Sequence, residues 1–160
     1  SLMRGLSSTL FAPNQSMTRG MMVTTLYRLA GEPQVEGTAT FQDVKSSAYY
    51  ANAVAWAEAN GIAKGIDTGV FAPNAPVTRE QAAAFAYRYV TAYLGKTPAP
   101  GASLGGFQDA GLVSDYAAES LSWAHAAGLM VGYGDGFLGP KDTVTRAQMA
   151  KLLTLLAQNF

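Results

Sequence analysis

The feature that most constrains this chain is an internal repeat. A Thr-Arg pair that precedes an amphipathic segment occurs three times, beginning at Thr18, Thr78 and Thr145. The pairs are 60 and 67 residues apart. Recurrence of one pattern along the whole chain indicates tandem supersecondary units that bury their apolar faces against one another.

A second block supports the duplication. Phe-Gln-Asp begins at Phe41 and again at Phe107, and a tryptophan follows each block, at Trp56 and Trp123. Both tryptophans lie 22 residues before the threonine of their unit. We therefore expect three units separated by two linkers rich in Gly, Pro and small residues. The units are residues 1–31, 41–95 and 107–160, and the linkers are 32–40 and 96–106.

Each complete unit predicts two helices joined by an ordered loop. Apolar residues recur with helical spacing over 49–60. The second helix begins after Thr78, a favourable N-cap, and Gln81 three residues later completes a capping box. The glycines and prolines of the intervening loop favour tight turns. The pattern predicts an all-α fold of helix-loop-helix repeats, in which the first unit, 1–31, contains only the second helix.

Composition excludes several classes of function. The 160 residues are 49% hydrophobic, which is enough to build a core. Eleven basic residues balance eleven acidic ones, so no charge excess favours nucleic acid as a partner. The chain has no cysteine and a single histidine, which argues against a metal centre, and we expect no cofactor. No apolar run reaches the ~20 residues of a membrane span, so we expect no membrane insertion.

The arginine of each Thr-Arg pair is the first candidate for binding. Arg19, Arg79 and Arg146 lie in the first turn of a helix, where a cation opposes the helix dipole. One interpretation is an exposed side chain that duplication has retained. The other is an anion site, in which outward-pointing N–H groups and a guanidinium bind a carboxylate or phosphate.

Two further pairs have a structural and a functional interpretation. Asp43 and Asp109 precede the first helix of their units, where they either cap a turn, accept hydrogen bonds from sugar hydroxyls, or pair with a motif arginine. Trp56 and Trp123 are either core residues between helices or stacking platforms for a sugar ring.

The loops supply the remaining candidates. Tyr133 lies in a glycine-rich loop and is expected to be exposed, where it can contact a ligand. Lys64 lies at a nearby position of the second unit, and Arg4 matches it in the first. Both cations either supplement a motif arginine or are simply solvated.

Together these motifs resemble S-layer homology repeats over nearly the whole chain except the linkers. The resemblance rests on FQDV with its tryptophan, GIAKGIDTGVFAPNAPVTREQAAAFAYR and GLMVGYGDGFLGPKDTVTRAQMAKLL. It implies a pseudo-threefold, three-pronged spindle of helical bundles. It also implies a non-catalytic, extracellular module at the bacterial cell surface that anchors to secondary cell-wall polysaccharide, often pyruvylated. The ligand would lie in grooves between repeats, formed by the three arginines, both aspartates and the loop glycines Gly65 and Gly132.

Departures from the pattern generate further expectations. Without an opening helix in the first unit, Met22, Leu26 and Leu29 should be partly uncovered. A missing N-terminal segment or a second copy of the chain would then cover them. A second hypothesis for function is a structural module that self-associates in a surface layer. A glycan-processing enzyme is disfavoured because no pair of carboxylates has a fixed spacing in the repeats.

Overall fold

The computed structural model describes residues 2–3 and 11–160, and the chain in these ranges is helical. It contains five α-helices, two 3₁₀ turns at Ala110–Leu112 and Asp115–Ala117, and a π-helical turn at Tyr89–Tyr93. The α-helices are α1 (Arg19–Leu29), α2 (Ala51–Ala59), α3 (Arg79–Arg88), α4 (Ala118–Ala126) and α5 (Arg146–Asn159). The described residues contain isolated β-bridges but no strand. The all-α expectation is confirmed.

The predicted helix caps are present in the structure. The Thr78 hydroxyl accepts a hydrogen bond from the Gln81 amide, while the Gln81 side chain accepts one from the Thr78 amide. Thr145 and Gln148 form the same reciprocal box. These bonds satisfy amides that a helix start otherwise leaves unpaired, which explains why the helices begin where they do.

A ring of three backbone hydrogen bonds joins the repeats around a pseudo-threefold axis. The amide of Met17 donates to the carbonyl of Val144 at 2.8 Å, that of Val144 to Val77 at 3.0 Å, and that of Val77 to Met17 at 2.9 Å. All three residues are buried. The ring is closed, so every repeat contacts both of the others.

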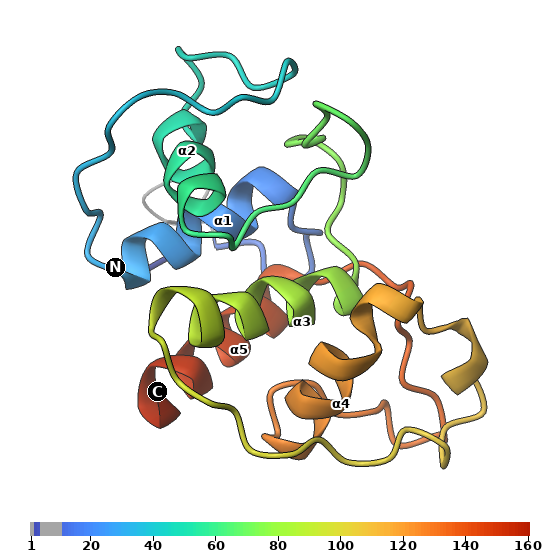
Figure 1. The fold of residues 1–160 in the computed structure, drawn as a ribbon. Coiled ribbons are helices and arrows are strands. Elements are labelled where there is room, and N and C mark those ends of the chain that lie inside the picture. Colours follow the sequence, from blue (N-terminus) through green and yellow to red (C-terminus); the bar gives the residue numbers. More distant parts are fainter. Residues whose placement is uncertain (1, 4–10) are drawn as a thin grey trace.

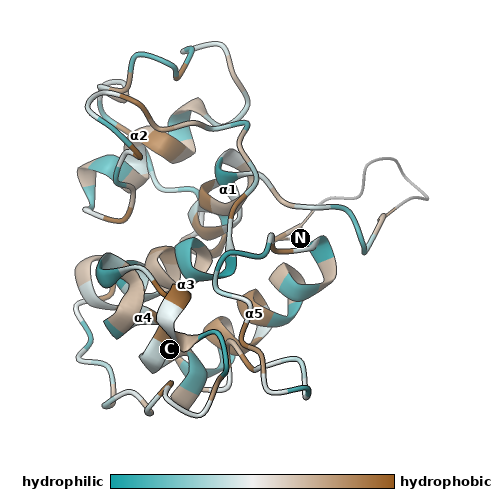
Figure 2. Ribbon diagram, turned by 90° about the vertical axis from the view of Figure 1, so that its right-hand side faces the viewer, coloured by the Kyte–Doolittle hydropathy of each residue, from teal (hydrophilic) through white to brown (hydrophobic). Residues whose placement is uncertain are grey.

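The helices pair across repeats. Helix α1 of the first repeat packs against α2 of the second, and α3 of the second packs against α4 of the third (Figure 1). Met22 and Leu26 are fully buried, so the expectation that they are partly uncovered is wrong, because α2 packs on α1 and covers them. Leu29 is partly buried. Hydrophobic and hydrophilic residues alternate along the helices (Figure 2), as expected for helices that bury one side.

One side of α5 is exposed, whereas the matching side of α3 is buried. Ala147 and Lys151 of α5 are exposed. The residues at matching positions in α3, Glu80 and Ala84, are buried. Among the described residues, α5 therefore has no paired helix equivalent to α2 or α4.

Candidate functional site

The three motif arginines are buried side chains that bind the loop of the next repeat. Arg19 donates from Nε to the Phe71 carbonyl at 2.8 Å and from Nη2 to the Lys64 carbonyl at 3.1 Å. Arg79 repeats this with the carbonyls of Leu138 at 3.0 Å and Val131 at 2.6 Å. The Nε of Arg146 donates to Phe11 at 2.7 Å. Each guanidinium therefore joins one repeat to another, so the arginines are not exposed side chains retained by duplication.

The first amides of the three helices are also engaged by neighbouring repeats. The Arg79 amide donates to the Asp142 carbonyl at 2.8 Å and the Glu80 amide to Pro140 at 3.0 Å. The starts of α1 and α5 are bound in the same way by the loops that follow Phe71 and Phe11. The expectation of outward-pointing N–H groups is thus wrong, because carbonyl oxygens of the protein already occupy them.

The two aspartates organise the loop of their own repeat. Both oxygens of Asp43 accept backbone hydrogen bonds, from Phe71 at 2.9 Å and Ala72 at 2.7 Å. Asp109 accepts from Leu138 and Gly139 at 2.9 and 2.8 Å. The turn-capping interpretation fits this geometry. Ala72 has a φ of 56°, a left-handed conformation that these bonds help to maintain.

Both carboxyl groups have a pKa below the ordinary value. Partial burial alone would raise the pKa of Asp43, but the backbone donors and the Arg19 charge lower it further than burial raises it. For Asp109 the Leu138 amide is the main cause of the lowered pKa. A carboxyl with a lowered folded-state pKa stabilises the fold above its unfolded pKa, and that stability is lost as the pH falls through the folded pKa.

We therefore expect the double variant Asp43→Asn, Asp109→Asn to be less stable than wild type at pH 6 and to lose less of its stability between pH 4 and pH 2. Urea unfolding at a series of pH values measures this. Glu36→Gln, at an exposed carboxylate, serves as the control and should retain the wild-type acid dependence. Parallel curves for the double variant and wild type would contradict the assignment.

Both tryptophans lie in the core. Trp56 is 3% exposed and packs against Tyr27 and Tyr93, with ring centroids 5.5 and 5.0 Å away. Trp123 is 2% exposed and lies 5.4 Å from the ring of Tyr87. Neither indole offers a ring face to solvent, so the stacking-platform interpretation is corrected in favour of the core interpretation.

The two loop glycines permit close approach within the protein. A Cβ on Gly65 would lie 2.6 Å from the Val70 carbonyl oxygen and 2.7 Å from that of Asp67. A Cβ on Gly132 would lie 2.6 Å from the Phe107 ring. These contacts explain the glycines without a ligand, although Gly65 also lines the groove described next.

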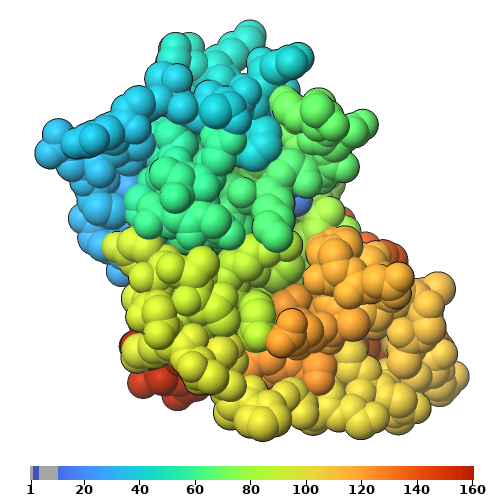
Figure 3. All heavy atoms as spheres, viewed as in Figure 1, coloured from blue at the N-terminus to red at the C-terminus, as the bar shows by residue number. Residues whose placement is uncertain are grey.

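A groove with a volume of about 590 Å³ lies between repeats, and we call it the α3 groove. The surface is hollowed between the loop of the second repeat and the third-repeat segment near residue 116 (Figure 3). Arg19 of α1, the loop residues Lys64, Gly65 and Ile66, and Tyr116 line it together with one side of α3. The α3 residues are Gln81, Ala84, Phe85 and Arg88.

The α3 groove is lined by three cations and no carboxylate. Burial lowers the pKa of both Arg19 and Arg88. A neighbouring acid, Glu80, is buried and bound to Lys141 at 2.6 Å and to the Ser114 hydroxyl at 2.8 Å. Burial alone would raise the pKa of Glu80, but these donors lower it below its ordinary value. Asp43 interacts electrostatically with Arg19 from behind the loop, but the lining itself has no carboxylate, so an anion in the groove would meet positive charge.

Sequence reasoning identified part of this groove. Arg19, Lys64 and Gly65 lie together in it, whereas Arg88 and Tyr116 were missed. Both had a signal in the repeats, because Arg88 follows Arg28 by one period of 60 and Tyr116 follows Tyr49 by one of 67. Arg4, the match of Lys64 in the first unit, lies outside the described residues.

Tyr133 is exposed, as predicted, but it lies outside the α3 groove. Its ring is 4.8 Å from the guanidinium carbon of Arg79, and its hydroxyl donates to Asp142 at 2.8 Å. Tyr133, in the third repeat, therefore covers the guanidinium of Arg79, in the second repeat. Its exposed ring leaves it able to contact a ligand there.

The fold and the groove define a pseudo-threefold module of helical repeats joined by buried arginines. The S-layer homology domain model matches residues 40–83 and 106–150. The chain belongs to this family.

None of the helices in the described part of the chain has both the length and the apolar character to span a membrane. The described residues also bring together no group of three or more metal-binding side chains.

Relatives of this chain are larger proteins. It is 36% identical over 152 residues to an endoglucanase of Bacillus sp. (strain KSM-635) and 32% identical over 155 residues to an amylopullulanase of Thermoanaerobacterium thermosulfurigenes. It is 32% identical over 152 residues to a surface-layer 125 kDa protein of Lysinibacillus sphaericus. The matches cover 95%, 95% and 93% of this chain but only 16%, 8% and 12% of the relatives. Family membership indicates a module associated with the cell surface or cell wall.

Proposed function

We propose that this chain is a non-catalytic module that anchors a larger protein to bacterial secondary cell-wall polysaccharide. The α3 groove is the observation that carries this proposal, because its three cations and its position between repeats suit an anionic saccharide. A pyruvate ketal on a sugar would supply such a group, since its carboxylate is ionised at neutral pH.

The relatives support anchoring rather than catalysis. They include two enzymes and a surface-layer protein, and they share with this chain only a minor part of their length. A segment common to proteins with such different activities is more readily explained by attachment than by one reaction. A location in the wall on the cell exterior is part of the same proposal.

In this proposal some residues of the α3 groove attract the anion and others hold the shape of its wall. Arg19 and Lys64 attract the anion. The Nε and Nη2 of Arg19 are held in place by backbone carbonyls of the second repeat. Asp43 holds the loop that shapes the groove wall. Gly65 lets that loop turn closely against itself. Arg79 and Arg146, with Asp109, Gly132 and Tyr133, form the corresponding parts of the other repeat interfaces.

Co-sedimentation with purified sacculi of the source bacterium tests the function. Wild-type protein should pellet with sacculi that retain the polysaccharide and remain in solution once that polymer has been removed by acid extraction. Charge-assisted contacts to the anion should make the binding weaken as salt is raised. Equal pelleting before and after extraction would contradict polysaccharide binding.

The same assay separates anchoring from the alternatives. A module that only self-associates would form oligomers in sedimentation equilibrium and would not pellet selectively with intact sacculi. An enzyme acting on the wall would release new reducing ends from the sacculi during incubation. The proposal expects neither result.

A further inference from the structure

The internal symmetry allows the α3 groove to be compared with a second groove of this chain. The second one, which we call the α1 groove, lies one repeat earlier, and its volume is about 60 Å³. Arg146 takes the position of Arg19, and Arg28 takes that of Arg88. Tyr49 takes the position of Tyr116, so the two grooves use the same three residue types.

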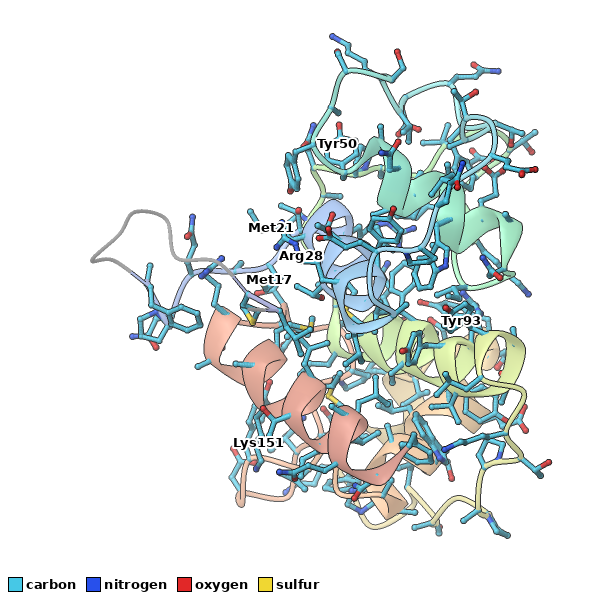
Figure 4. All side chains as sticks on the ribbon, turned by 90° about the vertical axis from the view of Figure 1, so that its left-hand side faces the viewer. Met17, Met21, Arg28, Tyr50, Tyr93 and Lys151 are labelled. Carbon is cyan, nitrogen blue, oxygen red and sulfur yellow. The ribbon has the colours of Figure 1, made fainter. Side chains whose placement is uncertain are left out.

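Methionines line the α1 groove at positions where the repeat carrying the α3 groove has other residues. Met21 stands where the α3 groove has Gln81, and Met17 stands at the position of Val77. Met3 also lines the groove. Figure 4 shows Met17, Met21 and Arg28 gathered at α1. Flexible thioether side chains fill irregular gaps well, and they offer little hydrogen bonding to a saccharide.

The matched arginines Arg28 and Arg88 also differ in their neighbours. The Nε of Arg28 lies 3.5 Å from the Glu32 carboxylate, an ion pair one helical turn apart. The residue at the matching position after Arg88 is Ala92, which has no charge. In the third repeat Leu155 replaces the arginine itself. Of the three matched positions, 28, 88 and 155, position 88 alone has a cation without an acidic residue four positions later.

We propose that the anionic group of the ligand binds in the α3 groove and not in the α1 groove, with Arg88 as the specificity-determining residue. This inference rests on the proposed function. Tyr116, half exposed on the opposite wall, presents its ring to the sugar while its hydroxyl lies 3.4 Å from Glu80. The side-chain oxygen of Gln81 accepts from the Thr78 amide, and its side-chain NH2 group lies where the α1 groove has a thioether.

The matched arginines provide the test. Arg88 donates to the Ile62 carbonyl at 3.3 Å, and Arg28 donates to the matching carbonyl of Leu2 at 3.5 Å. Substituting either one removes the same internal bond. We expect Arg88→Gln to weaken the binding of sacculi that retain their polysaccharide by about tenfold or more, whereas Arg28→Gln should stay within about twofold of wild type. Arg88→Lys, which keeps the charge, should recover part of the loss.

A second matched pair protects the test against misfolding. Tyr116→Ala should weaken binding to the same sacculi, and Tyr49→Ala should not. Both rings are exposed, at 55% and 64%, so their removal leaves the core intact. The groove assignment would be overturned if wild type pellets but Arg28→Gln and Arg88→Gln lose binding equally, or if Arg28→Gln alone loses it. Either result would leave the anchoring function standing. Wild type that fails to pellet would overturn the anchoring function itself.

Discussion

Arg79→Ala is expected to lower the free energy of unfolding by about 2–5 kcal/mol, because it leaves two partly buried carbonyl oxygens without donors. Those oxygens belong to Leu138 and Val131 in the loop of the next repeat. The side chain is itself 5% exposed, so its loss also leaves a cavity that Tyr133 borders. Urea unfolding followed by circular dichroism measures the change.

Two variants separate this structural role from a general effect of charge. Lys151→Ala removes an exposed cation from α5 and should change stability by less than about 0.5 kcal/mol. Arg79→Lys retains the charge but lacks the planar fork that reaches two carbonyls, so it should recover only part of the stability. An Arg79→Ala protein as stable as wild type would show that the two hydrogen bonds contribute little.

The stability result also decides how wall-binding experiments on these arginines are interpreted. A motif arginine that joins two repeats cannot be removed without loosening the groove it lines. Loss of binding in Arg19→Ala therefore does not by itself identify a ligand contact. Arg88 and Lys64 are better probes, because each is more exposed than Arg19 and lines the same groove.

Gly65→Ala is the second substitution with a large expected effect, about 1–3 kcal/mol of destabilisation. The new methyl group would lie 2.6 and 2.7 Å from two backbone oxygens, which are less free to move than the end of a side chain. The loop must shift to relieve the contact. Because Lys64 and Ile66 flank this glycine and line the α3 groove, we expect binding to sacculi to weaken as well.

A glycine in open space provides the matched control. A Cβ on Gly106 would have no neighbour within 4 Å, and its φ lies outside the left-handed range. Gly106→Ala should therefore be neutral or slightly stabilising through the unfolded chain. If Gly65→Ala behaved like Gly106→Ala in thermal unfolding, the close approach seen at Gly65 would not be a constraint on the loop.

Local features of the fold could be predicted from the sequence, and long-range ones could not. The capping boxes at Thr78 and Thr145 depend on residues three positions apart, so the chain displays them directly. The partners of the arginines are remote: Arg19 binds a carbonyl 52 residues away and Arg146 one 135 residues away. A spacing pattern identified these arginines as unusual but did not indicate that they bind the protein's own backbone.

The pairing of helices explains the main error. Sequence order suggested that the two helices of one repeat belong together, which left Met22 and Leu26 without cover. In the structure α1 packs instead on α2 of the following repeat. The candidate site was found in part for a similar reason, because the α3 groove takes residues from three repeats. Arg88 and Tyr116 acquire their setting only when those repeats are assembled.

The closed ring of Met17, Val77 and Val144 also sets how many repeats one module can hold. In an open solenoid each unit contacts only its neighbours, so units can be gained or lost at either end. Here the third unit already bonds back to the first. A fourth copy would find no free backbone edge at the axis. Duplication within such a gene would therefore be expected to yield a second complete module rather than a longer one.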